Sequence, residues 1–527
     1  MTYWASAPQK RDQMVLFPER LDEAVPPDHA VRLLDMIFGQ LDWVKWESRY
    51  HGQLGQPPIH PRVLAGVLLY GLLTRIRSSR SLEDALRVRL DFRWLAEGRT
   101  IDHTTLSEFR RKHGAELKDL FVQIGLVARK LGLLSLTTLA FDGTRVRANN
   151  RRSGTRTLAG LRKMQEELAA KFEELEAKAA AEDTREDEAF ASVESSTRAK
   201  EWGDLKRQQE QVAAALAELE RAEQAGETLP KRVPLTDPQS RLTPNKEGGF
   251  APNYTPLATV DVESGLIVSS DVIAMTNEER HLVSAIEDVQ EQFGLETPSP
   301  EMLADGLMAT GANLAALEAR GVTLYSPIAI PDPTTNPAVR DDPTQPVPSE
   351  DWDRLPMKNV RVNGKKSRQL DKAAFIYDEA RKCYWCPLGQ PLEYATTTSE
   401  TPHGERRFRD RYRADPQTCA GCPLRERCVQ GKAKQRQVSR EQHEGLREHQ
   451  ARRMATPEAK QKYARRRHPG ERPFAMIKHH FGARRFLLRG LHRVRIEWDW
   501  LATAFNLQRL MSLIESRAGP IAATVVS

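Results

Sequence analysis

The sequence of 527 residues predicts an α/β protein whose central sheet is interrupted by two insertions and preceded by helices. Three observations support this fold class. Segments of strand and helix character alternate between residues 131 and 327, a stretch rich in Ala, Glu, Lys and Arg separates two of the strands, and all five cysteines lie close together further on. The length predicts several domains, because a single hydrophobic core rarely serves more than ~300 residues.

Residues 1–130 are predicted to form a helical domain. Apolar residues recur at helical spacing from Pro61 to Leu73, and Ser81-Leu-Glu-Asp84 has the pattern of a capping box at the start of the next helix. The segment from Asp102 to His113 predicts a capped, basic helix. Short helices that end in a basic one are typical of helix-turn-helix DNA readers, and many ordinary helical domains share the pattern.

Residues 131–156 and 228–327 are predicted to form the sheet. A first strand ends at Asp142, and strands at 254–261 and 266–273 flank a turn, as in a hairpin. A second segment of strand character ends at Asp305. The remaining elements are predicted as a helix near 278–293, a helix near 312–320 and a strand at 322–325. This alternation favours an α/β sheet.

Residues 157–227 are predicted to form an antiparallel coiled-coil hairpin inserted in the sheet domain. Apolar residues keep a three-and-four spacing from Leu161 to Ala179 and again from Leu205 to Leu219, on either side of a polar break at 182–196. We expect this insertion to be structural or dimer-forming, with no chemistry of its own.

The second insertion, residues 328–440, is predicted to contain a proline-rich linker or loop, up to Pro348, followed by a zinc-binding region. Cys419-Ala-Gly-Cys422 and Cys428, with a more distant cysteine, suit tetrahedral coordination of a structural Zn²⁺. Cys383 and Cys386 are both candidates for the fourth ligand. The alternative is a set of five free buried thiols.

The charge distribution favours a polyanionic partner. The net charge is +7, with a sequence pI near 9.1. Between residues 431 and 500 there are 19 Lys or Arg against seven Asp or Glu. Residues 441–518 are predicted to be helical, ending in a helix at 498–514, so phosphates would approach a basic helical region. A solvated charged face is the alternative interpretation.

No secretory signal or membrane span is predicted. The start, Met1-Thr-Tyr-Trp4, lacks a charged segment followed by an apolar one, and the longest apolar run, Val63–Leu73, is too short to cross a bilayer. We therefore expect a cytoplasmic protein that has no membrane partner.

Three acidic residues stand in contexts that suit a divalent-metal site. Asp142 ends the apolar run that begins at Leu136, and Asp305 ends the segment that begins at Glu301; a glycine follows each of them. Glu471 lies in the basic region. Acids at the carboxyl ends of buried strands meet at a sheet edge, and a third acid on a helix completes the oxygen ligands that Mg²⁺ prefers.

Several blocks of sequence carry a family resemblance. They are 76–83, 101–110, 141–148, 235–238, 254–261, 303–305, 474–478, 486–491 and 504–507. In this order they resemble the DDE transposases of bacterial insertion sequences, and specifically the IS-eleven-eighty-two family, a relative of the larger IS-four group. The resemblance covers nearly the whole chain.

The resemblance implies an RNase H-like catalytic core that cleaves DNA at terminal inverted repeats and transfers strands to target DNA. It implies two Mg²⁺ (or Mn²⁺) ions, with Asp142 bridging them and Asp305 and Glu471 each holding one. It also implies a homodimer on double-stranded DNA, association with the bacterial nucleoid, and Cys386 as the fourth zinc ligand, because the family places a cysteine before Pro-Leu-Gly.

Related transposases carry Tyr, Arg, Glu and Lys on one helix around the third acid. Lys478 lies seven residues after Glu471 and Arg467 four before it, as that signature requires, whereas Tyr463 is one position out of place. Because Pro and Gly resist mid-helix positions, His468-Pro-Gly470 predicts either that the helix begins near Glu471 or that the geometry differs from the family pattern. The predicted DNA-binding residues, all positively charged, are Arg110, Arg111, Arg467, Lys478, Arg484 and Arg485.

Other interpretations remain open at this stage. Asp261 is the main competitor as a core acid, although Asp is common in turns, and Glu497 is a weaker rival to Glu471. His281 and Asn277 suit packing or caps. The competing functions are a catalytically inactive DNA-binding repressor derived from a transposase and a metal-dependent nuclease without strand transfer.

Overall fold

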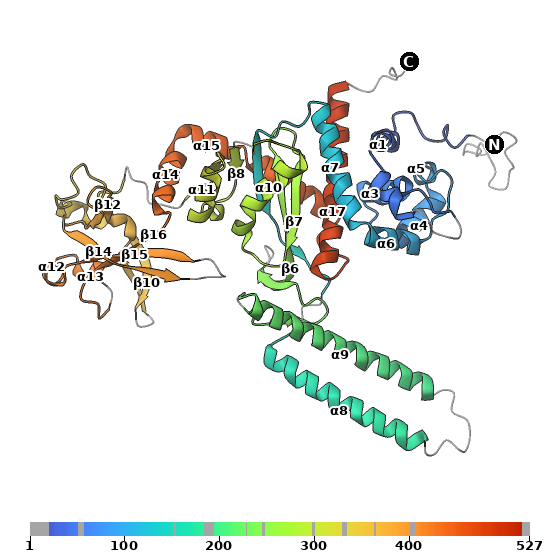
Figure 1. Ribbon diagram of the computed structural model, residues 1–527, viewed down its shortest axis with the longest axis horizontal. Helices are drawn as coiled ribbons and strands as arrows, with labels where there is room; N and C mark the ends of the chain where they lie inside the picture. Colours follow the sequence, from blue (N-terminus) through green and yellow to red (C-terminus); the bar gives the residue numbers. More distant parts are fainter. Residues whose placement is uncertain are drawn as a thin grey trace, which may run out of the picture.

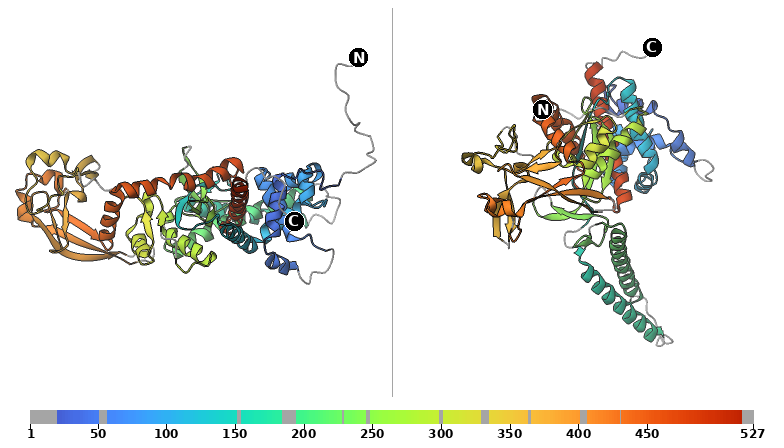
Figure 2. Two further views of the ribbon diagram at one scale, coloured as in Figure 1. Left: turned by 90° about the horizontal axis from the view of Figure 1, so that it is seen from above. Right: turned by 60° about the vertical axis from the view of Figure 1, so that its left-hand side comes forward.

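A computed structural model describes the chain from residue 20 to residue 518, apart from ten internal gaps. The described ranges are 20–50, 57–150, 154–183, 194–227, 229–244, 248–297, 301–328, 335–362, 365–400, 406–429 and 431–518. A central sheet lies between a bundle of N-terminal helices and a second, smaller sheet, and a long helical hairpin projects away from it (Figures 1 and 2).

The central sheet has seven strands within the described residues. The strand β6 (Phe250–Asp261) pairs antiparallel with β1 (Thr138–Gly143) on one side and with β7 (Ile267–Ile273) on the other. On its far side β1 pairs parallel with β8 (Glu301–Leu303), and β8 pairs parallel with β9 (Thr323–Tyr325). Over this part of β6 the order is therefore β7-β6-β1-β8-β9.

The other end of β6 extends beyond these strands and carries two short partners. They are β2 (Val146–Arg147) and β5 (Arg241–Pro244), both antiparallel to β6. A separate two-stranded ribbon joins β3 (Thr155–Arg156) to β4 (Val233–Pro234), on either side of the first insertion.

Helices cover both faces of the central sheet. Side chains alternate along each strand, so successive residues pack against opposite helical layers. Leu139 and Phe141 face the main hydrophobic cluster, which includes the connecting helix α10 (Leu282–Gln292). Ala140, Leu303 and Tyr325 face the opposite way, into a smaller cluster with residues of the helices α14 (Glu444–Ala455) and α15 (Pro457–Ala464). Asp142 has the same parity as Ala140, so it belongs to this second face.

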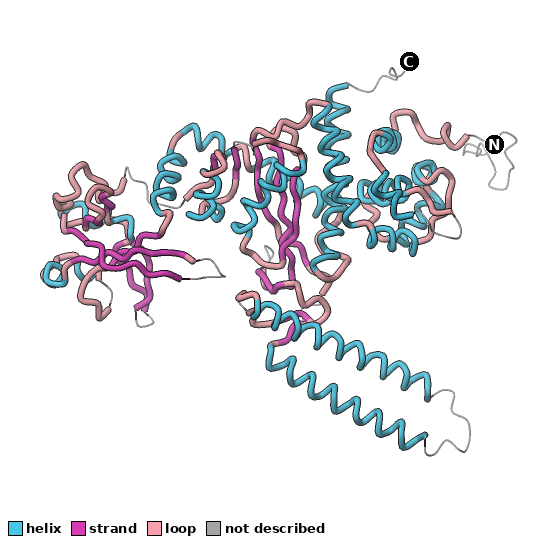
Figure 3. The backbone as a smooth tube through the Cα atoms, viewed as in Figure 1, coloured by secondary structure: helices cyan, strands magenta, loops and turns pink. Residues whose placement is uncertain are grey.

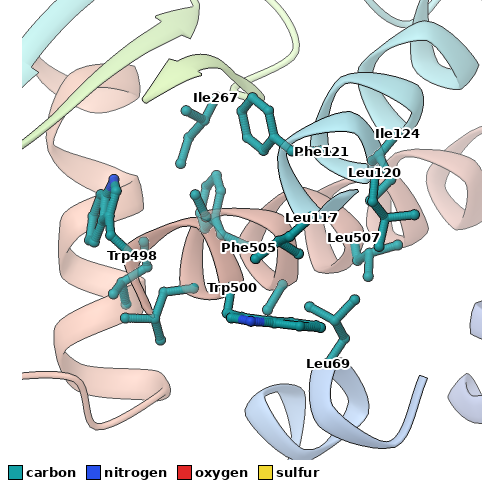
Figure 4. Packing of buried hydrophobic residues seen from close by; sticks show 14 of the residues in the cluster. Leu69, Leu117, Leu120, Phe121, Ile124, Ile267, Trp498, Trp500, Phe505 and Leu507 are labelled. Carbon is teal, nitrogen blue, oxygen red and sulfur yellow. The ribbon is translucent and has the colours of Figure 1, made fainter. Parts of the chain in front are cut away.

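The N-terminal helices and the sheet share one hydrophobic cluster. It contains residues of α3 (Pro61–Leu73), α7 (Gly114–Lys130) and α17 (Leu491–Ala518) as well as β7. In Figure 4, Leu117, Leu120, Phe121 and Ile124 of α7 lie beside Phe505 and Leu507 of α17, and Trp500 lies between α17 and Leu69 of α3. The helical region is thus joined to the sheet through a common core.

The other N-terminal helices are short. They are α1 (Ala30–Gly39), α2 (Val44–Glu47), η1 (Ser48–Tyr50), α4 (Ser79–Val88), α5 (Leu90–Leu95) and α6 (His103–Lys112). Asp102 caps α6 by accepting bonds from Thr104 N and Thr105 N. The predicted capping box at Ser81 is wrong: Ser78 is the N-cap of α4 and accepts from Ser81 N. Two equally good caps three residues apart made the sequence ambiguous.

The first insertion consists of two long helices packed along each other (Figure 3). They are α8 (Leu158–Asp183) and α9 (Glu194–Gln224). The hydrophobic contact between them includes Leu161, Leu168, Val212 and Leu219. Further along the helices the Phe172 and Trp202 rings pack edge to face, with 5.1 Å between their centroids. Most of the polar break between the helices lies outside the described residues.

The second insertion has its own sheet and core. Its five antiparallel strands run in order β12 (Ile376–Asp378), β13 (Cys383–Trp385), β14 (Pro391–Glu400), β15 (Arg407–Ala414) and β16 (Gln437–Glu441). A separate hairpin joins β10 (Met357–Val362) to β11 (Lys365–Leu370). The short helices are η4 (Ser349–Arg354), η5 (Lys372–Ala374), α12 (Pro416–Ala420) and α13 (Arg425–Cys428).

The chain then returns to the central sheet through α14 (Glu444–Ala455), α15 (Pro457–Ala464) and α16 (Arg467–Ala475). The Gln450 amide donates to the carbonyl oxygens of Leu324 and Ser326 at the β9 edge. At the opposite edge the Asn506 amide bonds both N and O of Ile267 in β7. Both edges are therefore covered, which prevents pairing with another chain.

No helix in the described part of the chain is long and apolar enough to cross a membrane.

The shared core predicts a large stability difference between two leucines of α7. Leu117 is 0% exposed and Leu126 is 41% exposed. We expect Leu117→Ala to lower the free energy of unfolding by ~2–5 kcal/mol, because it leaves a cavity between α7 and α17. Leu126→Ala is the matched control and should change it by less than ~0.5 kcal/mol. Urea unfolding followed by circular dichroism measures both, and equal effects would contradict the shared core.

Candidate active site

Asp142 lies near the end of β1, on the sheet face covered by α16. Its Oδ1 accepts a hydrogen bond from Gly143 N at 2.9 Å. A Cβ placed on Gly470 of α16 (Arg467–Ala475) would stand 3.7 Å from Asp142 Oδ2, at van der Waals contact, so this turn of the helix lies against the carboxylate. Asp142 is therefore partly enclosed between the strand and the helix.

Asp305 follows β8 on the parallel strand beside β1. Its carboxylate caps the short helix η3 (Gly306–Met308) by accepting from Leu307 N at 2.9 Å, and its carbonyl oxygen accepts from the Ser326 hydroxyl. Gly306 is required here, because a Cβ would stand 2.8 Å from the Pro327 carbonyl oxygen. The parallel pairing brings Asp305 to the same sheet edge as Asp142.

Glu471 lies in the middle of α16, which begins four residues earlier, at Arg467. The helix thus begins one turn before Glu471, close to the first of the two alternatives that the sequence left open. Pro469 falls in the first turn, where no N–H donor is needed, so it does not break the helix. Pro473 is inside the helix, and a π-helical turn, η7 (Met476–His480), follows it.

The three acids influence one another electrostatically. Burial raises the pKa of Asp142, the charge of Arg466 opposes that rise, and the charges of Asp305 and Glu471 add to it. The Arg466 guanidinium forms an ion pair with Asp142 at 3.0 Å. The charges of all three predicted acids thus act in one region, beside an arginine that sequence reasoning did not single out, although their side chains as described do not form a ready metal-binding group.

A fourth carboxylate, Glu278, completes the group. It begins the short helix η2 (Glu278–His281), and a Cβ at residue 143 would overlap its carboxylate. Burial, followed by the charges of Asp142 and Asp305, raises the pKa of Glu278 to about 7. Sequence reasoning missed Glu278, because the residue lies just beyond the strand β7 in an ordinary polar segment.

Lys478 reaches the same site from η7. Its Nζ donates to Thr144 Oγ1 at 2.6 Å, two residues beyond Asp142. Arg467 is exposed and points to no described partner, whereas its neighbour Arg466 pairs with Asp142. Tyr463 is half-buried against the Ala140 and Leu303 cluster, so it packs against the sheet.

The two competing acids serve local structure. Asp261 is 0% exposed and accepts bonds from Leu136 N and Ser264 N, which fix two turns. Glu497 pairs with Arg77 at 2.8 Å and accepts from Leu487 N. Among the described residues, the charged groups that act most strongly on Asp142 are Arg466, Asp305 and Glu471, and neither competitor is one of them. His281 is half-buried, and Asn277 precedes η2.

Parts of the chain match two known families. Residues 385–511 match the family described as Transposase DDE domain, and residues 19–112 match Transposase domain (DUF772). Both matches support a DDE transposase. The DDE-domain match includes Glu471 but begins after Asp142 and Asp305, so the two aspartates are placed by geometry alone. No curated protein matches the chain.

Of the six predicted DNA-binding residues, five lie at or near the surface and one faces the interior. Arg111, Arg467, Arg484 and Arg485 are exposed and Lys478 is half-buried. Arg110 is half-buried: its Nη1 donates to the Arg77 carbonyl oxygen at 3.2 Å, and burial lowers its pKa. Arg110 therefore joins α6 to the interior, a position unsuited to phosphate contact.

Four of the five cysteines gather beside the core of the second sheet. Cys428 is part of that core, and Cys386, Cys419 and Cys422 pack against it. Burial raises the pKa of Cys428 to about 12, and the other three cysteines contribute to the rise. Cys383 is buried elsewhere, near Asp378 and Arg381. The structure thus separates Cys383 from the other four.

Backbone donors point at two of these sulfurs. Gln390 N donates to Cys386 Sγ at 3.4 Å, within the turn Cys386-Pro-Leu-Gly389, and Leu424 N bonds Cys422 in a second Cys-Pro-Leu turn. Such donors stabilise a thiolate, the form that binds metal. As the described side chains stand, however, no group of three or more His, Cys, Asp or Glu is arranged to hold a metal ion.

The Glu278 environment predicts a pH-dependent stability effect in metal-free protein. An ordinary glutamate pKa is near 4.5, and here it is about 7, so folding disfavours the ionised form and stability falls as pH rises between these values. We expect Glu278→Gln to raise the Tm at pH 8 by ~1–3 °C and to leave it nearly unchanged at pH 5.

Thermal scans in the presence of a chelator measure this effect. Glu279→Gln, one residue along, is the matched control and should show no such pH dependence. A Glu278→Gln shift of equal size at both pH values would contradict the electrostatic explanation.

Proposed function

We propose that this protein is a DNA transposase. It binds the terminal inverted repeats of an insertion sequence and catalyses metal-dependent cleavage and strand transfer of DNA. The observation that carries the proposal is the placement of Asp142, Asp305 and Glu471, which come from segments spread over more than 300 residues of the chain, at one end of the sheet beside a basic helix.

The strand order supports an RNase H-like catalytic core. The order β7-β6-β1-β8-β9 has two antiparallel pairings followed by two parallel ones. The first acid ends the central strand and the second follows its parallel neighbour, so both lie at the carboxyl ends of adjacent strands, where α/β folds place their active sites.

The acid group is chemically suited to Mg²⁺ or Mn²⁺. Its donors are carboxylate oxygens. Burial, with a smaller contribution from neighbouring like charges, raises the pKa values of Asp142 and Glu278, and a divalent cation would offset both effects. Asp142, Asp305 and Glu471 would hold the metal. Two such ions, when bound, activate the attacking water or 3′-hydroxyl and stabilise the leaving oxygen.

The protein's own side chains would position the DNA. Lys478, held by Thr144 next to Asp142, stands where a phosphate near the scissile bond would lie. Arg466 forms an ion pair with the Asp142 carboxylate in this structure, and it would pair with a phosphate instead once metal binds. Arg111, Arg467, Arg484 and Arg485 extend the basic surface for double-stranded DNA, and synapsis of two ends implies a homodimer.

We also propose that the second sheet binds one structural Zn²⁺ through Cys386, Cys419, Cys422 and Cys428. Four sulfurs and two backbone donors suit a closed tetrahedral site, which contributes to folding and takes no part in catalysis. Cys383 is excluded from this set by its separate position.

The proposed chemistry predicts a specific loss in Asp142→Asn. We expect Mg²⁺-dependent cleavage of DNA carrying the element's terminal repeats to fall by at least ~100-fold, because the central carboxylate would no longer bind metal. Binding of the same DNA should be retained. Asp271→Asn, an aspartate at β7 that pairs with Arg495, is the matched control and should cleave normally.

A gel assay for cleavage and a mobility-shift assay for binding give the two measurements. Binding without cleavage in the wild type would favour the inactive repressor, and cleavage without joined products would favour a nuclease. If the wild type neither binds nor cuts the repeats, the proposal is wrong.

The zinc proposal predicts a difference between two cysteine variants. Purified wild-type protein should contain about one Zn²⁺ per chain by elemental mass spectrometry. Cys422→Ser should lose most of it and lower the Tm, whereas Cys383→Ser should keep it. Equal zinc content in both variants would reject the proposed ligand set.

A further inference from the structure

A groove of about 740 Å³ lies next to Asp305, outside the acid group, and is lined by Gly306 and Leu307 among others. One wall is formed by η3 and the start of α11 (Gly311–Glu318). The other wall is formed by the beginning of β15, the end of β16 and the start of α14. The groove therefore lies between the catalytic sheet and the second insertion, the two parts that flank α14 in Figure 1.

The walls approach each other closely at one point. A Cβ on Gly311 would stand 2.7 Å from the Cβ of His443, so only glycine fits there. Thr310 caps α11 by accepting from Asn313 N, and the first residues of the helix, Gly311 and Ala312, line the groove. The first N–H groups of a helix have no partner within it and attract anions.

The lining is predominantly basic. It contains four arginines and two glutamates. Arg409 is paired with both glutamates, at 3.4 Å from Glu400 and 3.5 Å from Glu441. Arg447, whose charge also acts on nearby Glu444, has a buried Nε without a hydrogen-bond partner. The remaining positive charge, together with the helix N-terminus, suits a phosphate.

Two exposed apolar side chains also face this groove. Leu307 is 72% exposed and Phe408 is 40% exposed. The backbone N–H of Leu307 bonds the Asp305 carboxylate, so its side chain stands at the boundary between the groove and the acid group. The Arg406 guanidinium lies over the Phe408 ring at 5.1 Å. An exposed aromatic ring among arginines is a typical stacking platform for nucleic-acid bases.

We propose that this groove binds an unpaired DNA strand next to the scissile phosphate, with a base against Phe408 and Leu307. The adjoining phosphate lies between Arg406, Arg447 and the first turn of α11. The volume is within the range of pockets that enclose single small molecules, ~300–1,000 Å³, which suits one or two nucleotides. The inference rests on the proposed function, because the scissile phosphate is placed at the acid group.

The test compares two matched pairs of full-length variants by fluorescence anisotropy, all in the Asp142→Asn background to prevent cleavage. Phe408→Ala is paired with Tyr394→Ala, an exposed aromatic on β14 outside the groove. Arg406→Ala is paired with Arg413→Ala, an exposed arginine at the other end of β15. The probes are a labelled single-stranded oligonucleotide from the element's end and the duplex of the same sequence.

We expect Phe408→Ala to weaken binding of the single strand by at least ~5-fold, and Tyr394→Ala by less than ~2-fold. Phe408→Trp should restore wild-type affinity, because the larger ring still stacks. Arg406→Ala should reduce the slope of log K against log salt by ~0.7 for the single strand, and Arg413→Ala should not. Duplex affinity should change by less than ~2-fold in all variants.

Equal effects of Phe408→Ala and Tyr394→Ala, or no single-strand binding by the parent, would overturn the proposal. Equal losses for single strand and duplex would place the duplex backbone here instead, which also overturns it. These outcomes are distinct from failure of the proposed function, which is measured as the absence of metal-dependent cleavage by protein with intact Asp142.

Discussion

The parallel pairing of β1 with β8 is the constraint on which the site depends. Three backbone pairs, from Thr138↔Glu301 to Ala140↔Leu303, align the ends of two strands that are separated by more than 150 residues. Parallel strands need a long crossover, and here the crossover contains the first insertion, the hairpin β6–β7 and α10. Asp142 and Asp305 lie at the same end of the sheet because they stand at the carboxyl ends of these two parallel strands.

Electrostatic repulsion is the consequence of that alignment. Burial and like charges raise the pKa of Asp142 and bring that of Glu278 to about 7, so the site disfavours its own full ionisation without a cation. Arg466 supplies part of the missing positive charge by pairing with Asp142. A site that is electrostatically incomplete in this way is typical of positions that bind metal ions and phosphates.

The two outer strands of the sheet are covered by other parts of the chain. Gln450 and Asn506 cover the outer strands β9 and β7 with side-chain amides, while helices cover both faces. The acid group lies at the carboxyl ends of β1 and β8, which are inner strands of the sheet. The second insertion approaches this end through Gly311 and His443, and it encloses the basic groove beside Asp305.

The sequence by itself predicted most elements and nominated the three acids as a site, because apolar periodicity and strand-end aspartates are local signals. It placed α3 at Pro61–Leu73 without error, and it located the strands around Asp142 and Asp305. Only the tertiary structure shows that Glu278 lies beside the acids and that Arg466, not Arg467, pairs with Asp142. It also shows that Arg110 faces the interior and that Cys383 lies apart from the other cysteines. Each of these depends on contacts between segments far apart in the chain, and local propensity carries no information about which side chains such contacts bring together.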